Sequence, residues 1–162
     1  MDFSTSSNEG PTLTEYLQDD HKRLDNLFEM TFLYLRAGSR DRAMAAFQEF
    51  DEGLRHHIQM EDRVLFPAYE ERSGFTQGPT EVMRTEHRRI EESLGEIRAA
   101  LERLPPSFTG RDPSVLSLLE MQQRLLEILG PHNAKEERIL YPGCDRLISD
   151  KASLIRKMES LS

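Results

Sequence analysis

One eleven-residue segment occurs twice in this chain, once in each half. Residues 57–67 read HIQMEDRVLFP, and residues 132–142 read HNAKEERILYP. Both copies begin with His, carry Glu four residues later and end with Pro. On a helix, residues four positions apart lie one above the other on the same face. Each copy therefore presents an imidazole and a carboxylate in the same direction.

The repeat extends upstream of these two segments. Residues 20–25 read DHKRLD, and residues 86–91 read EHRRIE. Each half thus consists of a helix with one His, followed by a helix with His and Glu four apart. The connecting segments differ in length between the halves, which surface connections tolerate easily. The pattern predicts a duplicated helical hairpin whose two halves meet around a shared site.

Composition narrows the class of protein further. A length of 162 residues suits one domain, and no apolar run approaches the ~20 residues needed to span a membrane. The N-terminus lacks the apolar core of a signal peptide, and Cys144 is the only cysteine. A net charge of −8 argues against nucleic acid as a partner. We expect a cytoplasmic protein with no membrane segment, and the sequence leaves any protein partner unknown.

The hydrophobic pattern predicts an all-α protein. Apolar residues recur at helical spacing over residues 13–35, 43–64, 83–101 and 115–140, and no segment alternates as a strand does. Four long helices with short loops indicate an antiparallel up-down four-helix bundle. We expect a flexible N-terminal arm over residues 1–10, the bundle over 11–149, and a short C-terminal helix or tail over 150–162.

Several residues mark the expected helix ends. Thr12 opens a capping box, Thr80 is a candidate cap for the third helix, and Asp112 precedes a proline that suits the first turn of the fourth. Pro67 should end or kink the second helix. Pro131 should bend the fourth helix just before its His and Glu.

Six polar residues share the apolar faces of the four helices. Burying an unpaired carboxylate is costly, and neutral imidazoles in a core still need partners. A single His on an apolar face is usually a satisfied core residue, but six convergent groups repeated by symmetry favour a metal site. No acid–base dyad, nucleophile or cofactor-binding loop stands out elsewhere. The candidate metal ligands are His21, His57, Glu61, His87, His132 and Glu136.

This pattern, with Leu-Phe-Pro and Leu-Tyr-Pro after the two glutamates, resembles the hemerythrin-like (HHE cation-binding) domain family over residues 12–145. The resemblance implies two iron ions joined by an oxo or hydroxo bridge, with Glu61 and Glu136 bridging both. One iron would take His21 and His57 and the other the remaining two histidines, or the sharing would be permuted. Oxygen and nitrogen ligands without thiolate favour iron over zinc, and manganese is a further alternative.

The chain departs from classical oxygen-carrying hemerythrins. Their third helix supplies a His four residues from another His, whereas Met83 and Glu91 flank His87 here. The last carboxylate is Glu136, four residues after its His, instead of an Asp five residues after it. The set is more similar to bacterial hemerythrin-like stress proteins. The resemblance implies binding of O₂ or NO for sensing, storage or stress response; the alternatives are an enzyme that decomposes peroxide or NO, or an iron donor for repair.

The sequence leaves the roles of other residues near these motifs open. Glu91, four residues after its His, is either a further ligand or, with its repeat-mate Asp25, an orienting group for the histidines. Tyr141 could donate a hydrogen bond near the site, but Phe66 stands at the equivalent place in the first copy and cannot, which favours packing. His56 points about 100° away from its neighbour His57 around the helix and is expected outside the ligand set. Cys144 is expected to be inert.

Overall fold

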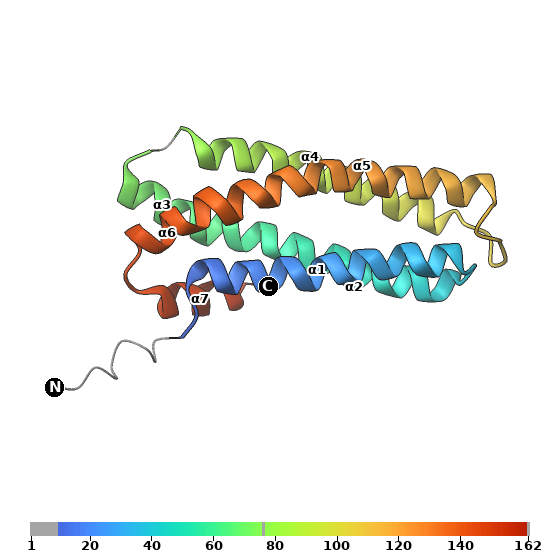
Figure 1. Ribbon diagram of the computed structural model, residues 1–162, viewed down its shortest axis with the longest axis horizontal. Coiled ribbons are helices and arrows are strands. Elements are labelled where there is room, and N and C mark those ends of the chain that lie inside the picture. The colour runs from blue at the N-terminus through green and yellow to red at the C-terminus, as the bar shows by residue number, and fades with distance from the viewer. Residues whose placement is uncertain (1–9, 76, 162) are drawn as a thin grey trace.

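In the computed structural model, residues 10–75 and 77–161 are described, and their regular structure is entirely helical (Figure 1). The expected all-α fold is confirmed. Residues 1–9 of the predicted arm lie outside the described part. No helix in the described part is long and apolar enough to cross a membrane. The elements are α1 (Leu13–Arg36), α2 (Arg40–Met60), η2 (Glu61–Leu65), α3 (Phe66–Ser73), α4 (Pro79–Glu102), α5 (Pro113–Lys135), η3 (Glu136–Leu140), α6 (Tyr141–Leu147) and α7 (Lys151–Glu159).

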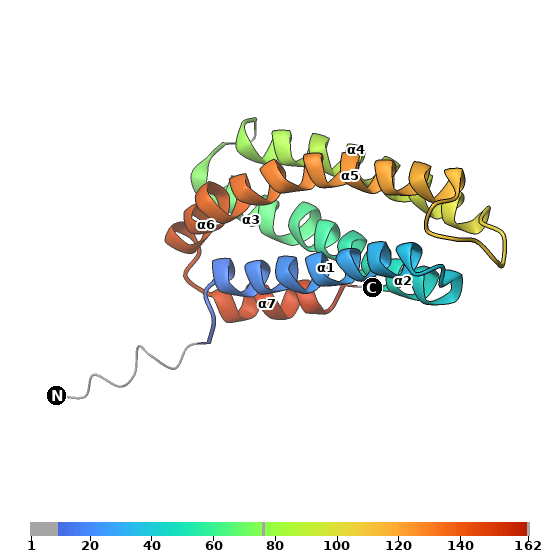
Figure 2. The ribbon, with the colours of Figure 1, turned by 45° about the vertical axis from the view of Figure 1, so that its right-hand side comes forward.

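Four long helical rods form the bundle. The rods are α1, the continuous run α2–η2–α3, then α4, and the continuous run α5–η3–α6. Figure 2 shows α1 and α2 as one antiparallel pair and α4 and α5 as a second pair facing it. The expected short C-terminal helix is present as α7, which packs against η2 and lies beside α1. The duplicated hairpin predicted from the repeat is thus the plan of the molecule.

The start of α1 is fixed by two sets of hydrogen bonds. The expected capping box is confirmed: Glu15 N–H donates to Thr12 Oγ1 at 3.0 Å, and Thr12 N–H donates to Glu15 Oε1 at 3.2 Å. Leu13 N–H also donates to Asp145 Oδ1 at 2.7 Å. Because Asp145 belongs to α6, these bonds tie the beginning of α1 to the end of the second hairpin.

Of two other expected caps, one was wrong and one is present. Thr80 does not cap α4, because Pro79 occupies the first turn and Gly78 is the cap residue. The Thr80 hydroxyl instead donates to Glu70 Oε2 at 2.6 Å, which joins α4 to α3. Asp112 is the cap residue of α5 as expected, although its carboxylate accepts from the backbone of the preceding loop.

Both repeat segments contain a single π-helical turn directly after the His–Glu pair. Phe66 N–H donates to Glu61 O, and Tyr141 N–H donates to Glu136 O, each five residues back instead of four. In a regular α-helix the ring of Pro67 would clash with the carbonyl four residues earlier. The wider turn accommodates the proline, so the helix continues as α3 and does not end at Pro67. Because the π turn contains one more residue than an α-helical turn, Leu65 is buried in place of the expected Val64.

The bundle core divides into two apolar clusters along its length. The larger, which we call the distal core, fills the end with the α1–α2 and α4–α5 turns and contains Phe28, Phe50, Leu94, Leu125 and neighbours on all four rods. The smaller cluster, which we call the proximal core, lies at the other end of the bundle, where α7 packs. It contains Leu17, Leu65, Phe66, Met83, Tyr141 and Met158. The six candidate ligands belong to neither cluster and come from the helix segments between the two.

Candidate metal centre

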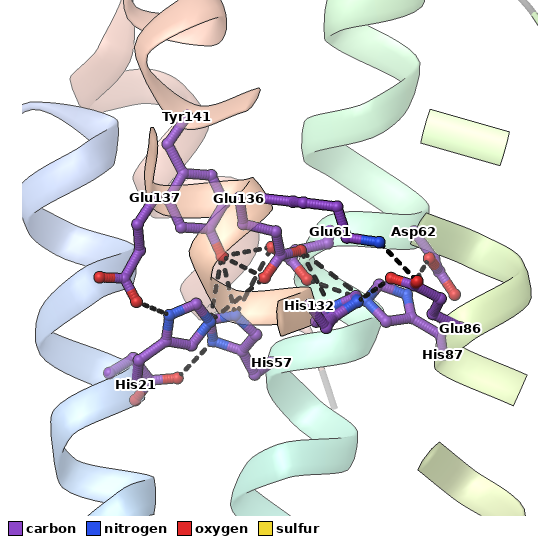
Figure 3. A network of polar contacts seen from close by, with 12 residues as sticks. His21, His57, Glu61, Asp62, Glu86, His87, His132, Glu136, Glu137 and Tyr141 are labelled. Atoms are coloured by element: carbon purple, nitrogen blue, oxygen red, sulfur yellow. Dashed lines mark hydrogen bonds and ion pairs between the residues drawn. The ribbon is translucent and has the colours of Figure 1, made fainter. Parts of the chain in front are cut away.

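All six predicted ligands converge inside the bundle. His21 comes from α1, His57 from α2 and Glu61 from η2. His87, His132 and Glu136 come from α4, α5 and η3. Each of these residues is at most 3 % exposed. Figure 3 shows the imidazoles and carboxylates pointing toward one another from the four rods.

The histidines form two pairs. The ring centroids of His21 and His57 are 4.6 Å apart, and those of His87 and His132 are 4.9 Å apart. Potential ligand atoms of His87, His132 and both glutamates all lie within 4.8 Å of one another. Those of His21, His57 and Glu136 do the same. Of the pairings that the sequence left open, the geometry therefore favours His21 with His57 and His87 with His132.

Each glutamate directs one oxygen toward each histidine pair. Glu61 Oε1 lies 3.1 Å from His87 Nε2, and its Oε2 lies 3.5 Å from His57 Nε2. Glu136 Oε1 lies 3.3 Å from His21 Nε2, and its Oε2 lies 3.4 Å from His132 Nε2. A carboxylate placed in this way can bridge two cations.

The outward nitrogen of each of the four candidate histidine ligands contacts a further carboxylate. His57 Nδ1 lies 2.8 Å from Asp20 Oδ2, and His132 Nδ1 lies 2.8 Å from Glu86 Oε1. Each of these acids immediately precedes the histidine of the neighbouring helix, in equivalent places of the repeat. Glu86 also accepts from Lys135 Nζ at 2.6 Å.

The other two histidines use the residues that follow the bridging glutamates. His87 Nδ1 lies 2.7 Å from Asp62 Oδ1, and His21 Nδ1 lies 2.9 Å from Glu137 Oε2. When Nδ1–H donates to a carboxylate, the Nε2 lone pair is directed to the centre, as metal binding requires. All four imidazoles are thus held in the orientation of metal ligands.

Of the two alternatives left open for Glu91, the role of orienting the histidines together with Asp25 was wrong. Glu91 is turned to the outside, where Arg88 Nε donates to its Oε1 at 2.9 Å, and it contacts none of the six candidate ligands. The Nδ1 positions are held by other acids. An acid before the first His and after the Glu recurs in both halves of the repeat, and that recurrence was the signal that could have identified them.

Tyr141 has a larger role in the centre than the sequence pattern favoured. Its hydroxyl donates to Glu61 Oε2 at 2.5 Å and lies 3.0 Å from Glu136 Oε1. It also lies 3.2 Å from Nε2 of both His21 and His57. The expectation of simple packing was therefore wrong, because the hydroxyl lies among the inward atoms of one histidine pair (Figure 3).

The π turn explains why Tyr141 faces the centre. Five residues along a regular α-helix rotate the chain by about 500°, so Tyr141 would point about 140° away from Glu136. A π turn instead places residues five apart above one another. Phe66, the repeat-mate of Tyr141, faces the other histidine pair and stacks on His87 with ring centroids 5.7 Å apart. The two halves of the centre therefore differ by one hydroxyl group.

The charges of the centre shift the pKa values of its members strongly. Burial alone would lower the pKa of His57, but the charge of Glu61 and the hydrogen bond to Asp20 outweigh it and raise the pKa to about 10. For His87, burial is likewise outweighed by the hydrogen bond to Asp62 and the charge of Glu61, and the pKa is raised to about 9. A cation that binds here takes the place of protons on the imidazoles.

Three buried atoms of the centre show that the residues fit a cation. Glu61 Oε1, His87 Nε2 and Glu136 Oε2 have no hydrogen-bond partner among the residues that the structure describes. The first two are 3.1 Å apart but are not aligned as a hydrogen bond. An unsatisfied buried polar group costs about 1–3 kcal/mol, and more if charged. Coordination of a cation would give all three a partner.

Fold and site together define a class: a helical bundle with a buried, duplicated His–Glu cluster suited to metal cations. Residues 12–144 match the hemerythrin HHE cation binding domain. The chain belongs to that family. No curated protein and no solved structure matches the chain significantly.

Two nearby residues remain outside the cluster. Cys144 is fully buried, and burial raises the pKa of its thiol to about 12, so the thiolate needed for redox chemistry is not formed at neutral pH. This agrees with the inert role expected for it. His56 is only partly buried and joins none of the groups that could hold a metal within the described residues.

Proposed function

We propose that this chain holds two iron ions, joined by an oxo or hydroxo bridge, and binds O₂ or NO there for sensing, storage or stress response. The observation that carries the proposal is the pair of glutamates that each direct one oxygen to each histidine pair. This arrangement supports a dinuclear rather than a mononuclear site. The ligand set contains oxygen and nitrogen without sulfur, which favours iron over structural zinc.

The protein residues would supply position and charge, and the iron would supply the redox chemistry. His21 and His57 would hold one ion and His87 and His132 the other, with both glutamates shared. Four neutral imidazoles and two carboxylates leave coordination positions for a small ligand. A histidine-rich set is also less anionic than a carboxylate-rich one, which favours the ferrous form and reversible binding.

The Tyr141 hydroxyl favours a second candidate function. Its single proton lies within hydrogen-bond distance of both bridging carboxylates, on the side of His21 and His57. A donor in that place can stabilise negative charge on a ligand or supply a proton to it. This supports the alternative of an enzyme that decomposes peroxide or NO.

The persistence of the oxygen adduct separates these two functions. Protein loaded with ferrous iron under anaerobic conditions is mixed with O₂, and near-ultraviolet and visible absorption is followed with time. An adduct that lasts for minutes to hours, and is reversed by removing O₂, supports binding. Immediate decay of the adduct, together with continued consumption of peroxide when peroxide is added to the protein, supports the enzyme. Absence of any iron-dependent spectrum would contradict both.

We further propose a cytoplasmic location, with small ligands as the physiological partners. The acidic net charge of −8 supports the exclusion of nucleic acid. Fractionation of cells that express the tagged chain should place it in the cytoplasmic fraction. The chain should also pass through nucleic-acid columns without being retained.

A further inference from the structure

The two halves of the centre differ in how their inward atoms are satisfied. Around His21 and His57, the Tyr141 hydroxyl contacts both imidazole Nε2 atoms and one oxygen of each glutamate. Around His87 and His132, no hydroxyl of the described residues takes that place, because Phe66 is the repeat-mate of Tyr141. We call these the tyrosine half and the phenylalanine half.

Within the described part of the chain, the atoms of the centre that have no hydrogen-bond partner belong to the phenylalanine half. They are His87 Nε2 and the glutamate oxygens Glu61 Oε1 and Glu136 Oε2, which face His87 and His132. The opposite oxygens, Glu61 Oε2 and Glu136 Oε1, are those bound by Tyr141. A cation that binds the phenylalanine half supplies a partner to protein atoms that otherwise have none. A cation that binds the tyrosine half must first displace hydrogen bonds that already exist.

We propose that the two metal positions fill in order, the phenylalanine half first and more tightly, and that Tyr141 sets this order by occupying the other position with its hydroxyl. The inference rests on the proposed metal centre and adds to it that the two positions are inequivalent. Tyr141 acts here as an internal competitor. A metal ion binds the tyrosine half only by displacing the Tyr141 hydroxyl, which lowers the affinity of that half.

The test is a titration of metal-free protein with cobalt(II), followed by absorption and by metal analysis after equilibrium dialysis. The wild-type chain should bind two ions in separable steps. Tyr141→Phe removes the hydroxyl but keeps the ring, so we expect an unchanged circular dichroism spectrum. The second step should become about tenfold to a hundredfold tighter, the range for one hydrogen bond to a charged group.

Histidine variants assign each step to a half. Repulsion between two cations would separate the steps in a symmetric site too, so the assignment is essential. His21→Ala should remove the weak step and leave the tight one. His87→Ala should remove the tight step. The two variants would instead have equal effects if the halves were equivalent, which would overturn the inference.

The repeat offers a matched control at Phe66. The double variant Tyr141→Phe with Phe66→Tyr moves the hydroxyl to the opposite half, so the order of filling should reverse. His87→Ala in that background should then remove the weaker step. Retention of the original order would overturn the inference, because a cause other than the hydroxyl would be setting it.

An ultraviolet difference signal gives an independent readout of the hydroxyl. In wild-type protein a tyrosine signal should appear only with the second equivalent of cobalt, and Tyr141→Phe should abolish it. A weakened second step in Tyr141→Phe would show that Tyr141 is a metal ligand, and an unchanged one would show that it is not involved; either contradicts the inference. If wild-type protein bound no cobalt at all, the proposed centre itself would fail.

Discussion

The distal core and the metal centre are built on the same four helix faces. Seven residues from each ligand histidine, toward the distal core, lies a buried apolar side chain: Phe28 for His21, Phe50 for His57, Leu94 for His87 and Leu125 for His132. In the distal core, the rings of Phe28 and Phe50 stack with centroids 4.3 Å apart. Two turns along the same helices, charged and polar groups converge in an equally buried space.

The difference between these regions shows how the bundle accommodates a buried polar site whose formation costs free energy. The distal core gains free energy from the burial of apolar side chains. The centre gathers carboxylates and imidazoles whose burial is unfavourable unless each is paired. Apolar packing and the candidate metal site therefore occupy different segments of the same helices. Substitutions in one segment should change stability, and substitutions in the other should change metal binding.

The largest expected effect comes from removing a bridging carboxylate. Glu61→Ala or Glu136→Ala takes away an oxygen from both halves together with a negative charge. We expect loss of the dinuclear centre, with at most one metal ion retained per chain by metal analysis. His56→Ala, one residue away from a ligand on the same helix, should leave the metal content unchanged. Loss of metal in His56→Ala with retention in His57→Ala would show that the inward face is assigned incorrectly.

A truncation in the distal core should affect stability without altering metal stoichiometry. Phe50→Ala leaves a cavity beside Phe28, and we expect a loss of about 3–5 kcal/mol in the free energy of unfolding. Denaturant titration measures this loss. The folded fraction at low temperature should still bind two ions per chain. Loss of metal in proportion to stability would mean that the two regions are not separable.

The pH dependence should come from the centre and not from the distal core. In metal-free protein the pKa of His57 is raised from 6.5 to about 10, so its contribution to stability is complete below pH 6.5 and is lost as pH rises through 10. His87, with its pKa raised to about 9, acts in the same direction. The free energy of unfolding should fall by up to about 1.4 kcal/mol per pH unit for each proton involved.

Urea titrations of metal-free protein between pH 7 and 10 measure this slope. His57→Ala should flatten it, whereas Phe50→Ala should lower stability equally across the range. A slope that is absent in wild-type protein, or that is unaltered by His57→Ala, would place the titrating groups elsewhere.

A smaller effect is expected from the outer carboxylates. Asp20→Asn keeps the shape of the side chain but weakens the hydrogen bond to His57 Nδ1, and metal affinity should fall about 10–100-fold. Glu91→Gln is the matched control, because Glu91 contacts arginines and not a ligand histidine. Competition with a chromophoric chelator measures both. Equal losses in the two variants would contradict the assigned role of Asp20.

Much of the fold and the six converging residues could be predicted from the sequence, because helical period and internal repetition both act over long stretches. His21 and Glu136 were identified as facing inward on that basis. Tyr141 was not, because its orientation depends on one π turn that breaks the period next to a proline. Asp20 and Glu137 lie beside ligands in sequence, but they reach histidines of other helices, and only the packing of the rods shows which ones.

The central claim is a dinuclear centre, and the most direct test is the metal content of the intact chain. Protein stripped of metal is loaded with ferrous iron under anaerobic conditions, freed of excess iron and analysed for iron and protein. We predict two irons per chain, with near-ultraviolet charge-transfer bands after oxidation. One iron per chain, or one zinc bound in preference to iron, would contradict the account.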